Sequence, residues 1–171
     1  MGENLHGRKG ENLMRELKLY PNDCLRAENE EVVKFDKGLR EIVNDMKDIM
    51  GRSVGIAAPQ IGVNKKIVVV HFNKYYVLIN PKIEITGKHD FTYTEECLSL
   101  PGEKVTINRP DYVRVSFQDI KGEPQQLAFE YFFSQALQHE LDHLEGKLII
   151  DYAIEPVTKE TIETLKRGED I

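Results

Sequence analysis

The chain has 171 residues, of which 40% are hydrophobic and 30% are charged, and it carries a formal net charge of -6. This length suits one domain with its own core, and the composition excludes a largely disordered chain. The negative charge argues against broad affinity for nucleic acid or for anionic membranes, because neither surface attracts such a protein at long range.

Two cysteines, Cys24 and Cys97, are too few and too far apart in the sequence to indicate a disulfide scaffold. Cys24 is expected to be a small packed side chain. No apolar run approaches the length of a membrane span or a signal-peptide core, so we expect a cytoplasmic protein. Residues 1–16 are expected to form a mobile tail, and residues 17–171 a single domain.

The first predicted helix begins after Asp36, which can cap it, and ends at Gly51. Its apolar residues recur at the spacing of an amphipathic helix. They are Leu39, Ile42, Val43, Met46, Ile49 and Met50. Before it, residues 17–26 indicate an extended segment followed by a turn. After it, small residues at 55–62 let the backbone pass close to another element or a ligand, and Gln60 is the side chain there that can contact a substrate.

Strand-forming residues predict two β-hairpins in the middle of the chain. The first turns at Asn73-Lys74 and the second around residues 87–90. His71 and His89 are expected to be structural or solvated, since no acidic or cysteine residue is spaced to join them in a metal site. The strand-like segments are residues 67–72, 75–79, 83–85, 91–93, 112–117 and 126–129.

An HExxH motif occupies residues 139–143, inside a segment with helical periodicity that ends at Gly146. Positions i and i+4 share one face of a helix, so His139 and His143 can bind one metal ion while Glu140 flanks it. For the motif alone, two histidines on a solvated helix face remain the alternative. Beyond it, residues 158–167 predict a short C-terminal helix.

Three separated segments, residues 55–60, 95–99 and 138–144, follow the order of three motifs of the peptide deformylase family. Those motifs are Gly-x-Gly-x-Ala-Ala-x-Gln, Glu-Gly-Cys-Leu-Ser and Gln-His-Glu-x-Asp-His. The chain therefore resembles that family over nearly all of residues 17–151. With the predicted elements, the resemblance implies an α+β fold whose antiparallel β-sheets pack around the central HExxH helix. An N-terminal amphipathic helix and a short C-terminal helix complete one catalytic domain, residues 17–171.

The resemblance implies that Cys97, His139 and His143 bind one divalent metal ion and leave a fourth position for water, as in a catalytic site. A thiolate ligand makes Fe²⁺, Zn²⁺ or Ni²⁺ acceptable, and the family favours Fe²⁺ in the cell.

The implied reaction is hydrolysis of the formyl group of N-formylmethionyl nascent peptides, which releases formate. Glu140 is expected to accept the proton of the attacking water and to deliver it to the departing amine. The Gln60 side chain and the backbone N–H of Leu98 are expected to donate to the oxyanion. By analogy, the methionine pocket is lined by Val54, Gly55, Phe132 and Ala136. Gln135 lies on the same side of the helix, and its place in the pocket depends on whether its polar side chain turns away.

Two glycines of the family motifs are replaced here, the first by Ser53 and the second by Glu96, beside the cysteine ligand. Glu96 is expected to weaken the acidification of water if it points toward the thiolate. Glu95 is expected to pair with Arg109 and brace the cysteine loop, an ordinary surface ion pair being the alternative. Asp142 is interpreted as a helix-surface acid or a partner for nearby backbone.

Two other functions stay open at this point. An HExxH metallopeptidase would take its third ligand downstream, where Glu163 is the candidate. A degenerate relative would bind formylated peptides without turnover, as Glu96 suggests. For the deformylase, the expected partners are formylated nascent peptides, with transient ribosome association left open, no DNA, no membrane and a monomeric state. Its location is then cytoplasmic, of the bacterial type.

Overall fold

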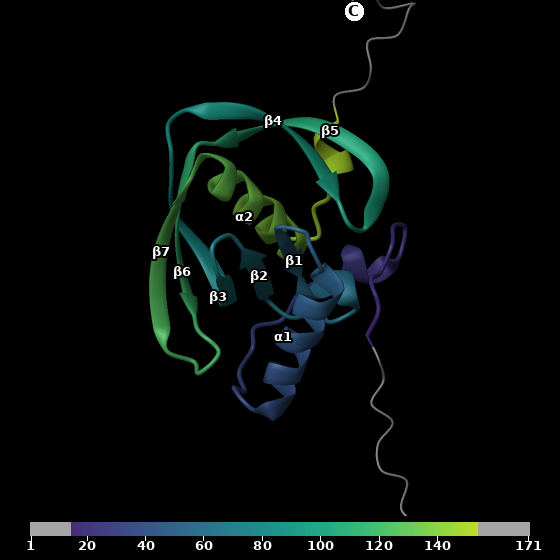
Figure 1. The fold of residues 1–171 in the computed structure, drawn as a ribbon, viewed down its shortest axis with the longest axis vertical. Helices are drawn as coiled ribbons and strands as arrows, with labels where there is room; N and C mark the ends of the chain where they lie inside the picture. The colour runs from purple at the N-terminus through teal and green to yellow at the C-terminus, as the bar shows by residue number, and fades with distance from the viewer. Residues whose placement is uncertain (1–14, 154–171) are drawn as a thin grey trace, which may run out of the picture.

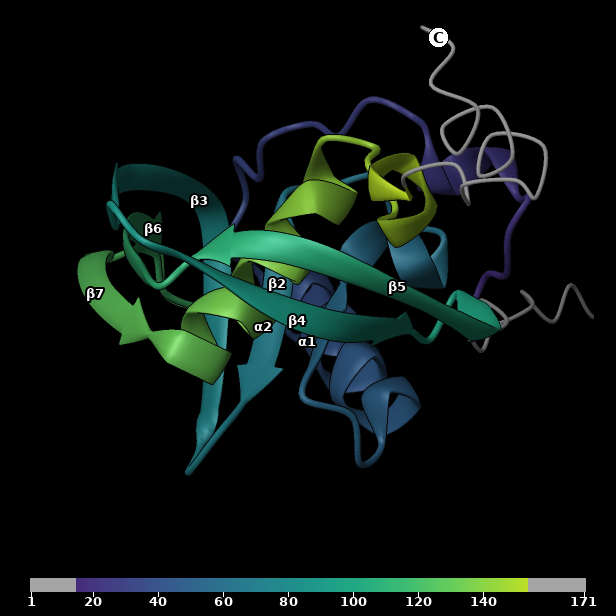
Figure 2. The same ribbon diagram turned by 90° about the horizontal axis from the view of Figure 1, so that it is seen from above.

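The computed structural model describes residues 15–153, and its seven strands there form two antiparallel sheets around one helix. The larger sheet has the order β1-β2-β3-β6-β7, and the smaller sheet pairs β4 with β5. Helix α2 (Tyr131–Leu144) lies between the two sheets, as Figures 1 and 2 show. The strands are β1 (Gly55–Ala57), β2 (Ile67–His71), β3 (Tyr75–Thr86), β4 (Asp90–Cys97), β5 (Leu100–Pro110), β6 (Tyr112–Gln118) and β7 (Pro124–Glu130). The predicted α+β class and the central position of the HExxH helix are confirmed.

Helix α1 (Lys37–Met50) forms where the sequence predicts it. The backbone N–H of Leu39 donates to the Asp36 carboxylate at 3.1 Å, which caps the first turn. At the other end Gly51 has a φ of 58°, a conformation that glycine adopts without steric cost. The buried side of α1 carries Leu39, Val43, Met46 and Met50.

The large sheet is covered on both faces, which explains the unbroken apolar run of β2. Ile67 and Val69 pack in the cluster under α1, whereas Val68 and Val70 pack in the cluster that includes Leu137 of α2. All four strand residues are fully buried. The sheet therefore fixes α2 from one side, and with it the two histidines of the motif.

The first predicted hairpin is confirmed, since His71 pairs with Tyr75 across the β2–β3 turn. The second is wrong: β3 continues to Thr86 and pairs with β6, while β4 pairs with β5 in the other sheet. Alternating residues on both sides of a turn predict two strands but not whether the chain folds back or crosses to another sheet.

Two further features differ from the prediction. Strand β5 was not predicted, because Pro101-Gly102 suggests a turn; the turn lies earlier, and Cys97 pairs with Leu100 across it. The small-residue segment at 55–62 comprises β1 followed by a 3-10 turn, Ala58–Ile61. The predicted N-terminal tail and the helix at 158–167 lie outside the described residues, apart from residues 15 and 16. No helix within 15–153 is long and apolar enough to cross a membrane.

Replacing Val68 with alanine should lower the free energy of unfolding by about 2 kcal/mol, because two buried methyl groups are lost and the core cannot fully close around the gap. Urea unfolding followed by circular dichroism measures the change. The same substitution at Val33, which is 80% exposed, should change stability by less than about 0.5 kcal/mol. Equal effects at the two positions would contradict the assignment of Val68 to the core.

Candidate active site

Three potential metal ligands converge at the end of β4 and along α2. One ligand atom each from Cys97, His139 and His143 lies within 4.8 Å of the others, and all three residues are buried. The Cys97 Sγ and His143 Nε2 atoms are 3.3 Å apart. Histidines on a solvated helix face are thereby excluded, and the predicted convergence of one sulfur and two imidazoles is confirmed.

The chemistry of this donor set fits a divalent ion of the transition series. A thiolate and two neutral imidazoles are common ligands of zinc and of ferrous iron. Burial lowers the pKa of His143 to about 3, which keeps its imidazole in the neutral form that binds metal. The three residues can therefore hold one such ion.

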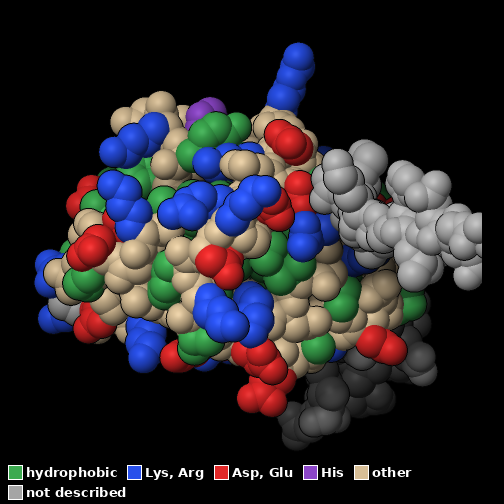
Figure 3. All heavy atoms as spheres, turned by 90° about the horizontal axis from the view of Figure 1, so that it is seen from below, with side chains coloured by type: hydrophobic (Ala, Val, Ile, Leu, Met, Phe, Trp, Pro, Cys, Tyr) green, Lys and Arg blue, Asp and Glu red, His purple; other side chains and the backbone are tan. Residues whose placement is uncertain are grey.

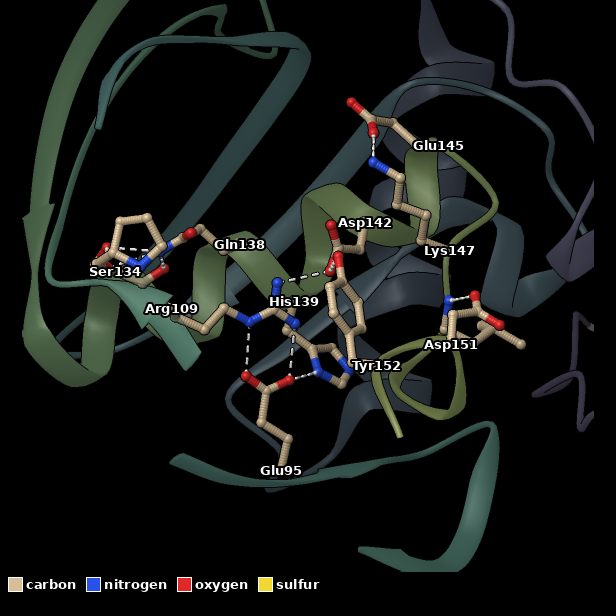
Figure 4. A network of polar contacts seen from close by, with 12 residues as sticks. Glu95, Arg109, Ser134, Gln138, His139, Asp142, Glu145, Lys147, Asp151 and Tyr152 are labelled. Atoms are coloured by element: carbon tan, nitrogen blue, oxygen red, sulfur yellow. Dashed lines mark hydrogen bonds and ion pairs between the residues drawn. The ribbon is translucent and has the colours of Figure 1, made fainter. Parts of the chain in front are cut away.

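A buried polar network orients His139 (Figure 4). The His139 Nδ1–H donates to Glu95 at 2.8 Å, and Arg109 binds the same carboxylate through Nε at 2.8 Å and Nη2 at 2.9 Å. The expected Glu95–Arg109 pair is confirmed, and it is not a surface pair, since the two side chains are 0% and 5% exposed. With Nδ1 engaged, the Nε2 atom of His139 is left to face a metal.

Asp142 is neither the free surface acid nor the partner of nearby backbone that the sequence suggests, because its carboxylate binds two side chains. It accepts a hydrogen bond from Arg109 Nη1 at 2.6 Å and another from the Tyr152 hydroxyl at 2.8 Å. The Tyr152 ring also lies under the Arg109 guanidinium, 5.1 Å from its centre. Sequence reasoning gave Tyr152 no role, because it lies in a 3-10 turn, Ile149–Tyr152, whose position against α2 no local pattern predicts.

The pKa values of the two acidic side chains around His139 are shifted in opposite directions. Burial raises the pKa of Glu95, but hydrogen bonds from Arg109 and His139 outweigh burial and lower it to about 2. Burial raises the pKa of Glu140 to about 7, and within the described chain its Oε2 has no hydrogen-bond partner. One carboxylate is thus a fixed charge that orients a ligand, and the other is free to exchange a proton.

Gly55 provides the space that Glu140 occupies. A Cβ atom at this position would lie 2.6 Å from Glu140 Oε1 and 2.7 Å from its Cγ. Such contacts are too close for any side chain, so glycine is required by close approach rather than by its backbone angles. The small-residue segment therefore serves the site directly.

Gln60 is held so that its amide N–H groups point toward the ligand cluster. Its Oε1 accepts from the backbone N–H of Ala57 at 2.8 Å, while Nε2 donates to Ser99 Oγ at 3.1 Å and lies 3.7 Å from Cys97 Sγ. Ser99 is fully buried and had no assigned role, although it lies in the motif that supplies Cys97. The hydroxyl helps to fix the Gln60 rotamer.

A cavity of about 540 Å³ opens beside these groups. The predicted pocket residues all line it, and so does Leu98. Phe132 is 50% exposed and therefore lies at the rim. Gln135 is only 8% exposed and lines the cavity, so it does not turn away. The pocket residues are Val54, Gly55, Phe132 and Ala136.

The two replaced glycines do not distort the site. Neither Ser53 nor Glu96 has a positive φ, so neither position needs a left-handed backbone. Glu96 is exposed and pairs with Lys104 Nζ at 2.6 Å across the β4–β5 hairpin. Its carboxylate points to solvent and not toward the thiolate. The condition under which Glu96 would weaken the acidification of water is therefore not met.

The family model for polypeptide deformylase matches residues 14–159. The chain belongs to this family. A peptide deformylase from Borreliella burgdorferi is 36% identical over 157 residues, covering 89% of this chain and 95% of that protein. A peptide deformylase from Picosynechococcus sp. is 35% identical over 144 residues, covering 80% of this chain and 77% of that protein.

Solved structures of deformylases share the fold. The crystal structure of a peptide deformylase from Synechococcus elongatus in complex with actinonin has a TM-score of 0.80 and 34% identity, covering 96% of this chain and 92% of that one. The crystal structure of the peptide deformylase from Thermotoga maritima also has a TM-score of 0.80, with 33% identity, covering 82% of this chain and 98% of that one.

Replacing Arg109 with alanine should weaken metal binding about 10- to 100-fold, because Glu95 would lose the partner that holds it against His139. Competition with a zinc chelator measures the affinity. Arg109→Lys, which keeps the charge but not the two-pronged contact, should lie between alanine and the wild type. The control is Arg40→Ala on the exposed side of α1, which should leave affinity unchanged. Wild-type affinity in Arg109→Ala would refute the bracing role.

Restoring the family glycine with Glu96→Gly should change metal content and turnover by less than about threefold, since an exposed ion pair contributes little. Metal analysis and steady-state kinetics on one preparation provide the measurement. A gain of tenfold or more in turnover would show that Glu96 impairs this deformylase. That result would contradict the expectation drawn from its exposed carboxylate.

Proposed function

We propose that the chain removes the formyl group from N-formylmethionyl peptides by hydrolysis, releasing formate and a free amino terminus. The observation that carries this proposal is the convergence of Cys97, His139 and His143 within 4.8 Å, next to a cavity into which the buried Glu140 faces. Membership of the peptide deformylase family supports it.

Cys97, His139 and His143 would hold one divalent ion, which when bound lowers the pKa of water and polarises the formyl carbonyl. We propose Fe²⁺ as the ion in the cell, with Zn²⁺ or Ni²⁺ able to substitute, since a site of one thiolate and two imidazoles accepts all three.

The proton transfers fall to Glu140. Its carboxylate takes a proton from the attacking water and returns it to the nitrogen that leaves when the formyl C–N bond breaks. The side chain is well placed for this because Gly55 leaves room for it and no described residue binds its Oε2. Glu95 cannot take the same role, since Arg109 and His139 already occupy its oxygens.

Two donors would stabilise the oxyanion that forms on the formyl oxygen. Gln60 Nε2 is one, and its orientation is fixed in advance by the Ala57 backbone, which binds the other end of the amide. The backbone N–H of Leu98, next to the cysteine ligand in the β4–β5 turn, is the second. Donors that are already oriented need no reorganisation during the reaction, which is the main source of such stabilisation.

The first side chain of the substrate would enter the cavity beside the ligands. Val54, Gly55, Phe132 and Ala136 give it apolar walls, which suit an unbranched methionine side chain.

We propose formylated nascent peptides as the partners, with at most transient ribosome contact and a monomeric enzyme. On the face shown in Figure 3, acidic side chains lie among the lysines and arginines, so this face offers no uniform charge to DNA or to a membrane. A bacterial-type cytoplasmic location is our expectation; relatives also include a protein named as chloroplastic from Solanum lycopersicum, 33% identical over 155 residues.

The two rival functions have less support. The metallopeptidase needs Glu163 as a ligand, and this residue lies outside the described part of the chain, whereas Cys97 completes the cluster within it. The binder without turnover rested on Glu96, whose carboxylate faces solvent.

Wild-type enzyme loaded anaerobically with Fe²⁺ should release formate from formyl-Met-Ala-Ser, measured by a coupled formate assay. Glu140→Gln should retain the metal but lose about 10³-fold in kcat, the usual size of general acid–base catalysis. Glu41→Gln, an exposed change on α1, should behave as the wild type. Absence of formate from the loaded wild type would overturn the proposed function, and full activity of Glu140→Gln would overturn the role of that residue.

A further inference from the structure

One polar side chain in the cavity is unexplained by the reaction described above. Gln135 lies on α2, one turn before His139, and is 8% exposed. None of the described residues hydrogen-bonds to its amide. The neighbouring Gln138 is as deeply buried, but its Nε2 donates to Pro110 O at 2.9 Å and to Ser134 Oγ at 2.9 Å. Of these two glutamines on one helix, only Gln138 has hydrogen-bond partners for its amide within residues 15–153.

The Gln135 amide faces the open space of the cavity. Within the described part of the chain, three fully buried side-chain atoms have no hydrogen-bond partner: Asp111 Oδ1, Glu140 Oε2 and His143 Nδ1. The Gln135 amide atoms are not among them, so they are not fully buried, and the cavity is the open space that this residue lines. Of the other α2 residues that line the cavity, Phe132 and Ala136 are apolar, and His139 and Glu140 already have roles in the reaction.

A buried amide without a partner is costly when an apolar group displaces its water. A pocket made only for the thioether of methionine gains nothing from such a group, because the sulfur is a weak acceptor. An amide at this wall is favourable when the bound side chain carries an oxygen that accepts its hydrogen bond. Such selectivity by satisfaction of buried polar groups is stronger than selectivity by shape alone.

We propose that Gln135 donates a hydrogen bond to an oxygen on the first side chain of the substrate, so that the enzyme also deformylates peptides that begin with N-formylmethionine sulfoxide. This inference rests on the proposed function. The sulfoxide keeps the length and the unbranched chain of methionine and adds a strong acceptor near its end. The reaction is the same hydrolysis: the hydroxyl of water adds to the formyl carbon, the formyl C–N bond breaks, and the proton of water goes to the departing amine. Formate leaves, and the sulfoxide is unchanged.

The test compares kcat/KM for four peptides: formyl-Met-Ala-Ser, the two separate sulfoxide epimers of the same peptide, and formyl-norleucine-Ala-Ser. In the wild type the better sulfoxide epimer should be within about tenfold of methionine. Gln135→Leu and Gln135→Met remove the donor, the second with little change in length, and in both the sulfoxide-to-methionine ratio should fall about tenfold. The norleucine-to-methionine ratio should stay the same or rise. Gln125→Leu, an exposed change on β7, should leave every ratio at its wild-type value.

Each result bears on the inference separately from the proposed function. If formyl-Met-Ala-Ser is hydrolysed but the sulfoxide ratio is unchanged in both folded variants, the inference is wrong and the function stands. If all four peptides lose activity equally in both variants, Gln135 contacts the peptide backbone instead, and the inference is again wrong. If the wild type hydrolyses none of them, the function fails and the inference fails with it. Circular dichroism and metal content establish that each variant is folded and loaded.

Discussion

The site depends on one buried charge, the Glu95 carboxylate of β4. It accepts from Arg109 of β5 and from His139 of α2, so a single group ties the small sheet to the helix that carries the histidines. A lone buried carboxylate would be strongly unfavourable, and here three N–H donors compensate it. The same bonds hold one imidazole in a fixed tautomer. The contacts that join the small sheet to α2 are therefore the same contacts that orient a metal ligand.

The opposite side of α2 is fixed by packing. Leu137 and Leu141 pack on the large sheet, while His139 and Glu140, which lie between them in the sequence, line the cavity. Because β2 is buried on both faces, α1 supports the sheet from behind, and the histidine positions are set by a continuous core. A helix held between an apolar sheet and a polar network has little freedom to shift, which suits ligands that must meet within a fraction of an ångström.

Sequence reasoning succeeded where local chemistry determines the outcome. The i, i+4 histidines, the cap of α1 and the turn at Asn73-Lys74 each follow from a few neighbouring residues. It failed at the second hairpin and at β5, since which strands pair is decided by contacts between distant segments. It also gave no role to Ser99 or Tyr152, whose partners lie 39 and 10 residues away in the sequence. The Glu95–Arg109 pair was reached through family resemblance, because spacing alone gives no sign that it is buried.

The two unusual side chains near the ligands have different consequences because of where they point. Glu96 replaces a motif glycine, but its backbone needs no left-handed angle and its carboxylate binds Lys104 in solvent, so the substitution is accommodated at the surface. Gln135 is only 8% exposed and lines the cavity, so its amide affects every molecule that enters the cavity. Closeness in sequence to a metal ligand is therefore a weaker guide to the effect of a side chain than its burial. In this chain the Glu96 side chain, next to the cysteine ligand, is mostly exposed, whereas Gln135, one helical turn before His139, is a buried polar group at the wall of the cavity.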